Sequence, residues 1–126
     1  MFVLASYPNK RPQSPLFFIQ SKGYQSGRPL QHAIANCFAV YSDDTTLFQK
    51  VFALWVTGKF REKVQDSVIP FLRKGDAEKV MRNVDKITVQ VAEAVQKTEE
   101  IIVLHEQKIK KYRELQKSLL RHKAGL

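Results

Sequence analysis

The stretch SKGYQSGRPL, residues 21–30, combines two glycines with two cationic side chains and could bind an anion. Gly23 and Gly27 permit backbone conformations that other residues avoid, and Lys22 and Arg28 stand directly beside them. Amides and cations gathered in such a loop can hold a phosphate. The alternative is a plain turn between two strands, since no helix follows at once to offer its N-terminal amides. The sequence favours the turn and leaves the phosphate loop as the second interpretation.

The other residue types that carry chemistry form no catalytic or metal-binding pattern. Cys37 lies in the apolar run ANCFAVYS, which predicts a buried side chain rather than a reactive thiolate. His32, His105 and His122 are far apart and have no cysteine or acidic cluster beside them at the spacing of metal ligands. The sequence contains no nucleophile elbow, Walker loop or paired carboxylates tied to a cleft. It therefore predicts no enzyme, no metal site, no cofactor and no small-molecule substrate.

Charge is the strongest compositional signal. Lysine and arginine number 21 against 12 aspartate and glutamate, which gives a net charge of +9. Such an excess favours anionic partners, nucleic acid above all, although a solvated and soluble surface explains it equally well. The excess is divided between residues 1–75 and residues 107–126.

The length and hydropathy of the chain predict one domain with an appendage. At 126 residues, with 44% hydrophobic and 26% charged residues, the chain can bury one modest core. No apolar run approaches the roughly 18 residues that a membrane-spanning helix requires. The N-terminus has no basic residue ahead of its short apolar run and no cleavage pattern, which is untypical of a signal peptide. We therefore expect a cytoplasmic protein without a membrane partner.

Three segments have the composition of strands. Residues 16–23 and 36–42 are short apolar or aromatic runs bounded by Gly, Pro, Asn and Ser. The segment DSVIPFL should form an edge strand or a strand end, because Pro70 has no N–H to donate. Residues 8–15 contain three prolines and should form an exposed loop.

A helix is expected from about residue 45. Thr46 and Gln49 have the spacing of a capping box, and Gly58 should end or bend the helix. The amphipathic pattern places Trp55 in the centre of the globular unit. The apolar face consists of Phe48, Val51, Phe52 and Trp55, widened by Leu47 and Leu54.

The C-terminal part has a heptad repeat. It contains neither Gly nor Pro between residues 76 and 124, and its apolar residues recur at alternating steps of three and four. We predict an α+β fold, with a small mixed unit over residues 1–80 and a long coiled-coil helix over 81–123. The helix should form a homodimer or bind a partner helix, because its apolar seam is otherwise uncovered. The seam contains Val91, Val95, Ile102, His105, Ile109, Tyr112 and Leu119.

Two segments resemble parts of the specificity subunits of type I restriction enzymes. LFQKVFALWVTGKFREKVQDSVIPFLRKGDAEKV is similar to the end of a target-recognition domain, most specifically at Ser67, Ile69, Pro70 and Leu72. EEIIVLHEQKIKKYRELQKSLLRH is similar to the long helix that follows such a domain. The resemblance covers about residues 47–121. The N-terminal FFIQSKGYQSGRPL…NCFAVYSDD is closer to a small uncharacterised family from Bacteroidota genomes and their mobile elements.

The resemblance implies a reduced specificity half-subunit, a non-catalytic module that contacts double-stranded DNA and dimerises through its helix. Phosphate contacts would come from lysines and arginines at turns that flank the core. The alternative is a structural or adaptor protein of a mobile element or phage, which acts through helix–helix assembly while its charge keeps it soluble. The candidate DNA-binding residues are Lys22, Arg28, Lys59, Arg61, Arg73 and Lys74.

Overall fold

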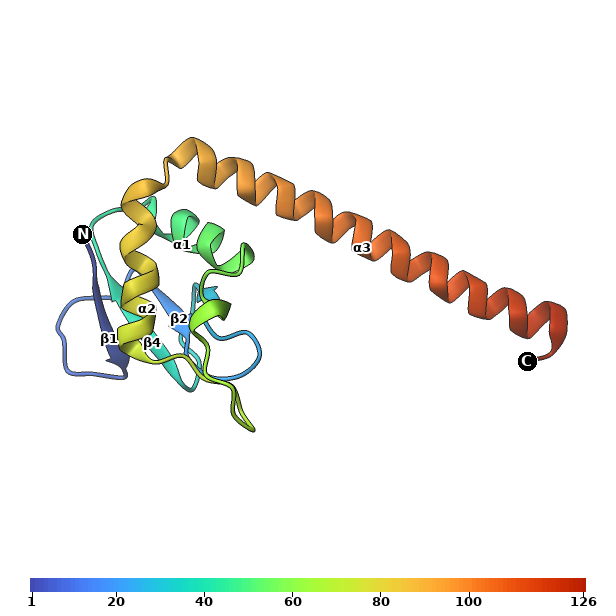
Figure 1. The fold of residues 1–126 in the computed structure, drawn as a ribbon, viewed down its shortest axis with the longest axis horizontal. Helices are drawn as coiled ribbons and strands as arrows, with labels where there is room; N and C mark the ends of the chain where they lie inside the picture. Colours follow the sequence, from blue (N-terminus) through green and yellow to red (C-terminus); the bar gives the residue numbers. More distant parts are fainter. The chain divides into compact units, whose positions relative to one another are not determined.

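A four-stranded antiparallel sheet lies at the centre of the first part of the chain (Figure 1). The computed structural model describes residues 1–126, which divide into the units Met1–Glu93 and Ala94–Leu126. The expected α+β fold with a long C-terminal helix is confirmed. The strands are β1 (Val3–Tyr7), β2 (Phe17–Gln20), β3 (Pro29–Leu30) and β4 (Cys37–Tyr41), and they lie in the order β1-β4-β2-β3.

Side chains of β2 and β4 alternate between the two faces of the sheet. Phe17 and Ile19 of β2 are completely buried in the main core, whereas Phe18 between them belongs to a smaller cluster on the other face. That smaller cluster contains Cys37, whose predicted burial is confirmed. The two apolar runs around residues 17–20 and 37–41 therefore form strands, as predicted, and the structure places them at the centre of the sheet.

The strand β1 was not predicted. It pairs with β4 over five residues, with Leu4 opposite Val40, and so completes one edge of the sheet. Only Leu4 of this strand is fully buried, so the sequence carries too little alternation to identify it. The proline-rich segment that follows is exposed, as expected, and the Nδ2 group of Asn9 donates to the Tyr41 hydroxyl at 3.1 Å.

Two helices of the first unit contribute to the main core with the sheet (Figure 1). They are α1 (Leu47–Val56) and α2 (Lys74–Met81), accompanied by the short 3-10 helices η1 (Arg61–Lys63) and η2 (Arg82–Lys86). The buried members of the main core are Leu4, Phe17, Ile19, Phe38, Val40, Leu47, Val51, Leu54, Phe60, Leu72, Ala77, Val80, Met81 and Val84.

The position of Trp55 differs from the prediction. Leu47, Val51 and Leu54 form the buried stripe of α1, whereas Trp55 is half-buried at the edge of the core, with its ring 6.1 Å from that of Phe52. The pattern LFQKVFALWV is apolar over most of its circumference, so two neighbouring stripes were available. The contacts with the sheet and α2 select the stripe of aliphatic residues.

The predicted capping box at the start of α1 is wrong. Thr46 is the N-cap residue, but its side chain makes no capping hydrogen bond. Its hydroxyl and its backbone N–H both donate to Oδ1 of Asp44, at 2.6 and 2.9 Å. These two bonds lower the pKa of the Asp44 carboxyl below its ordinary value. An Asp-centred turn therefore begins the helix in place of the Thr46–Gln49 pair.

The long helix α3 extends from Val89 to Ala124 and begins later than the predicted residue 81. The chain between α2 and α3 first forms the 3-10 helix η2 and then becomes extended at Ile87, with φ −107° and ψ 119°. The Thr88 hydroxyl accepts a hydrogen bond from the Val91 N–H at 3.2 Å and so caps the new helix. Neither α3 nor any other helix has the length and hydropathy needed to cross a membrane.

Candidate nucleic-acid interface

The loop after β2 is a double turn, as the sequence favours. Gly23 and Gly27 adopt φ values of +96° and +98°, in the region that favours glycine. The buried Ser26 closes the first turn, because its hydroxyl donates to the Gly23 carbonyl at 2.7 Å. The Gly27 N–H donates to the Gln20 carbonyl at 2.7 Å and returns the chain beside the end of β2.

This loop lies directly against the segment that follows α1. Gly27 packs so closely on the Phe60 side chain that a Cβ at residue 27 would lie 2.4 Å from the Phe60 Cβ. A second connection pairs residues 21–23 with 70–72. In it the Gly23 N–H donates to the Pro70 carbonyl and the Leu72 N–H donates to the Ser21 carbonyl, both at 2.8 Å. Residues 20–28 and 58–74, which we call the basic end, are therefore held together.

All six predicted DNA-binding residues lie in the basic end. Lys22 forms a β-bridge with Phe71, two residues from Arg73, and Arg28 follows the glycine that packs on Phe60. Arg28 is partly buried and its Nε has no hydrogen-bond partner, whereas the other five side chains are exposed. The basic end holds seven lysines and arginines against two acidic residues. The seventh cation, Lys63, was not among the candidates although it follows Arg61 closely in the sequence.

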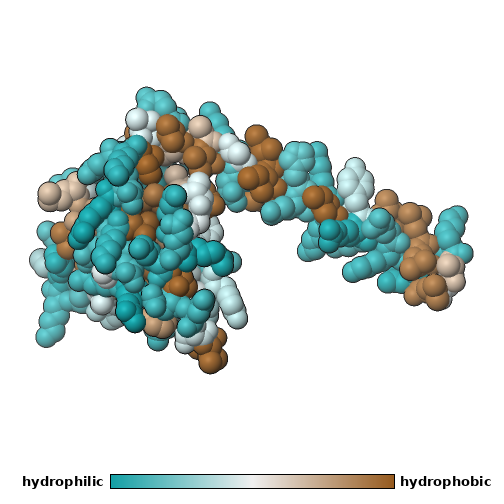
Figure 2. Space-filling view, in the orientation of Figure 1, coloured by the Kyte–Doolittle hydropathy of each residue, from teal (hydrophilic) through white to brown (hydrophobic).

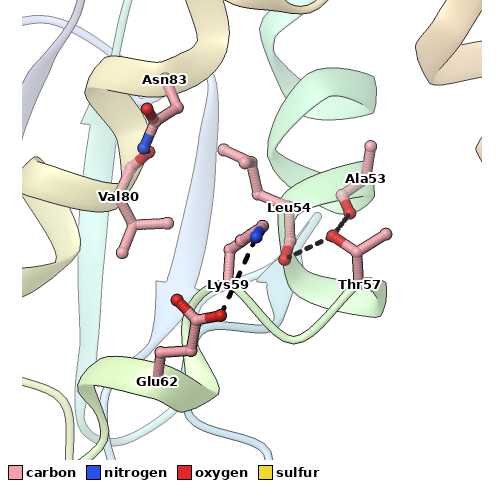
Figure 3. Close-up of polar contacts among 7 residues, drawn as sticks. All are labelled: Ala53, Leu54, Thr57, Lys59, Glu62, Val80 and Asn83. Carbon is pink, nitrogen blue, oxygen red and sulfur yellow. Dashed lines mark hydrogen bonds and ion pairs between the residues drawn. The ribbon is translucent and has the colours of Figure 1, made fainter.

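The end of α1 determines where residues 58–74, the second segment of the basic end, begin (Figure 3). The Thr57 hydroxyl donates to the carbonyl oxygen of Ala53 at 2.7 Å and also to that of Leu54 at 3.3 Å. Gly58 then adopts a φ of +83° and ends the helix, as predicted. The chain turns at this point and presents Lys59 to solvent.

The basic end remains largely unneutralised by its own acidic residues. Lys59 Nζ lies 3.9 Å from Glu62 Oε1, and Lys74 Nζ lies 3.7 Å from Glu78 Oε1 (Figure 3 draws the first pair). Both pairs are long, and three of the four side chains are exposed while Glu78 is half-buried, so the pairs contribute little to stability. The Arg73 guanidinium lies 5.9 Å from the centre of the Phe71 ring, a cation–π contact that leaves its positive charge unpaired with any carboxylate.

The segment DSVIPFL is a loop over residues 66–70, so the predicted edge strand is wrong, and only its end at Phe71 takes part in β-bridges. Phe71 bridges Lys22, and Gln65 and Phe71 also pair, with the Gln65 N–H donating to the Phe71 carbonyl at 2.8 Å. Between them Val68 and Ile69 are 96% and 61% exposed. Figure 2 shows apolar atoms protruding at the lower edge of the unit, where Figure 1 places this loop. The basic end thus carries an exposed aliphatic tip that the sequence pattern had assigned to a sheet.

The predicted seam residues lie along α3 and leave apolar side chains uncovered. Val95 is partly exposed, and the other six members of the seam are exposed. Apolar and polar groups alternate along the helix surface in Figure 2. Further exposed aliphatic residues widen the apolar face beyond the heptad positions, and these are Ile101, Leu104, Leu115 and Leu120. Ala92 is the one fully buried residue of α3.

A family of unknown function (DUF6943) matches residues 4–124, almost the whole chain. The protein belongs to this family. No curated protein and no solved structure matches it. The match includes the sheet except Val3, the basic end and the whole of α3, so the two units occur together in the family.

This DUF6943 protein also has a cleft of about 630 Å³ beside β1, η2 and the start of α1. Asp44, Glu78 and Asp85 line it with Arg82 and several apolar side chains. Asp44 is bonded to Thr46 and Glu78 is paired with Lys74, so both carboxylates already have structural partners. Nowhere in the chain do three or more His, Cys, Asp or Glu side chains gather to hold a metal ion. The basic end therefore remains the candidate site with the most distinctive chemistry.

Proposed function

We propose that this protein is a non-catalytic, cytoplasmic DNA-associated module that contacts the phosphates of duplex DNA through its basic end. It dimerises through α3, so that two basic ends act on one DNA molecule. The observation that carries the proposal is that two chain segments, residues 20–28 and 58–74, join at the basic end, where seven cations accompany two acidic residues. The resemblance to restriction specificity subunits supports the same function and rests on the quoted motifs alone.

The chemistry of the basic end fits phosphates better than base edges. Arginine and lysine neutralise phosphates and release their counterions, so binding falls steeply with salt. Five of the six candidate cations are exposed and free to reach a backbone. Such side chains can contact phosphates without a fixed position in a groove, whereas reading a base edge requires a side chain held in the groove in bidentate geometry. We therefore expect affinity for duplex DNA in general rather than for one sequence.

A fluorescence-anisotropy titration with random duplex DNA at two salt concentrations tests this function. The double variant Lys22→Ala, Arg28→Ala should weaken binding to every duplex and reduce the salt slope by about one unit for each residue. The control is Lys10→Ala, Lys86→Ala, which removes the same charge from exposed sites outside the basic end. Binding that falls equally in both variants would show an effect of net charge alone. Unchanged binding in the first variant would show that Lys22 and Arg28 do not contact DNA.

A second candidate function is a structural or adaptor role, and the uncovered apolar side chains of α3 favour it. In that role the helix is the working part and the cations serve solubility. The same titration separates the two functions. An adaptor would show no salt-dependent binding to DNA, although it would still assemble through α3.

A further inference from the structure

The charges of α3 are divided into two halves of opposite sign. Residues 89–106 carry four glutamates and one lysine, whereas residues 107–124 carry seven lysines and arginines and one glutamate. The division falls close to the middle of the helix, next to His105. A helix charged in this way is electrostatically complementary to a second copy of itself that runs in the opposite direction.

The seam of α3 also fits an antiparallel pair. When Ile102 of one copy lies opposite His105 of the other, the seam positions of each helix face seam positions of the second helix. The facing pairs are Val91 with Gln116, Val95 with Tyr112, Thr98 with Ile109, and Ile102 with His105. Each of these pairs contains at least one apolar side chain, so the seam is covered along most of its length.

We infer that α3 pairs with α3 of a second copy in the antiparallel direction. This inference rests on the proposed dimerisation and adds the orientation of the helices and their register. In the parallel direction the seven cations of one C-terminal half would face the seven of the other, and like charges across an interface are unfavourable. The antiparallel direction places the acidic half of each helix beside the basic half of the other.

Disulfide exchange between single-cysteine variants measures the orientation. The full-length chain carries Cys37→Ala, because this residue is its one cysteine and is buried. Val95→Cys and Tyr112→Cys are mixed in a glutathione redox buffer, and the disulfide products are separated by mass. A disulfide requires Cα atoms within about 7 Å, and two Val95 residues of an antiparallel pair would lie about 25 Å apart along the helices. We therefore expect the mixed disulfide to exceed each like-with-like disulfide by about tenfold or more.

His105→Cys is the control for dimerisation itself, because the two copies of this residue lie within one helical turn of each other in either direction. If His105→Cys forms a disulfide while like-with-like products dominate at residues 95 and 112, the helices are parallel and the inference is overturned. Equal amounts of all products would also overturn it, since they show no preferred direction. If His105→Cys forms no disulfide and sedimentation gives a monomer, the proposed dimerisation fails and the orientation with it.

Discussion

At the scale of single residues, Gly27 is the position where the fold is most sensitive to an added atom. A Cβ there would lie 2.4 Å from the Phe60 Cβ and 2.7 Å from its Cγ, and the backbone φ of +98° disfavours any side chain. We predict that Gly27→Ala lowers the free energy of unfolding by about 2–4 kcal/mol, from overpacking and backbone strain together. Urea denaturation followed by tryptophan fluorescence measures this change.

Gly58→Ala is the matched control for Gly27→Ala. Gly58 also has a positive φ, +83°, but no atom lies within 4 Å of the position that its Cβ would take. The free energy of unfolding of this variant should fall only by the cost of the backbone conformation, about 1 kcal/mol. Equal losses in the two variants would mean that the contact between Gly27 and Phe60 contributes nothing to the effect.

The free energy of unfolding should depend on pH through the Asp44 carboxyl. The Thr46 hydroxyl and the Thr46 N–H hold its pKa below the ordinary value of 3.8, so the ionised carboxylate is bound more favourably in the folded chain than in the unfolded one. This stabilisation is complete above the ordinary pKa and is lost as the pH falls through the lowered folded-state pKa. We predict that Asp44→Asn is less stable than the wild type near neutral pH, and that the difference shrinks as the pH falls below 3.8.

Denaturation curves of the wild type and Asp44→Asn at several pH values measure this difference. Thr46→Val provides the control, because it removes the hydroxyl donor and leaves the carboxylate and the Thr46 N–H position in place. It should reduce the pH dependence without abolishing it. A difference between wild type and Asp44→Asn that is the same at every pH would contradict the assigned cause.

At the scale of elements, α3 offers two neighbouring faces with different expected roles. Ile102 and Ile109 lie on the seam, whereas Val103 is exposed on the side that carries mainly charged residues. We predict that Ile102→Asp or Ile109→Asp converts the dimer to a monomer, because each places a charge in an apolar contact. Val103→Asp makes a similar chemical change beside the seam and should leave the dimer intact. Sedimentation velocity at one protein concentration compares the three variants with the wild type.

Two sedimentation results would contradict the predicted role of the seam. A wild-type protein that is already monomeric at tens of micromolar, a working range of order 10⁻⁵ M, would contradict the homodimer and favour pairing with a helix of another protein. Equal dissociation by Val103→Asp and Ile109→Asp would show that net charge, and not the seam, controls assembly.

At the scale of the whole molecule, the first unit contains its entire core. The main apolar cluster, including its partly buried members, lies between Phe2 and Ile87. We predict that a chain ending at Glu93 still unfolds cooperatively, with a free energy of unfolding within about 1 kcal/mol of that of the first unit in the full chain. Tryptophan fluorescence in urea follows this unit through Trp55. A chain of residues 1–93 without a cooperative transition would show that α3 is required for folding.

The sequence by itself determined the parts of this protein that depend on local patterns. The pattern of apolar residues identified β2, β4, α1 and α3, and turns at Gly23 and Gly27 and a helix end at Gly58 were predicted from these glycines. The sequence analysis also named six of the seven cations of the basic end. These signals can be read locally because each depends on the residue's own conformational preferences or on neighbours within a few positions.

Only the tertiary structure decided which residues far apart in the chain come together. It brought Gly27 against Phe60 and residues 21–23 beside 70–72, and so joined the cations of the basic end. It left Val68 and Ile69 exposed, although their composition is typical of a strand, and it buried Leu54 more deeply than Trp55. The physical reason is that an apolar residue is buried only where another segment covers it, and the sequence of one segment does not state which partner that will be.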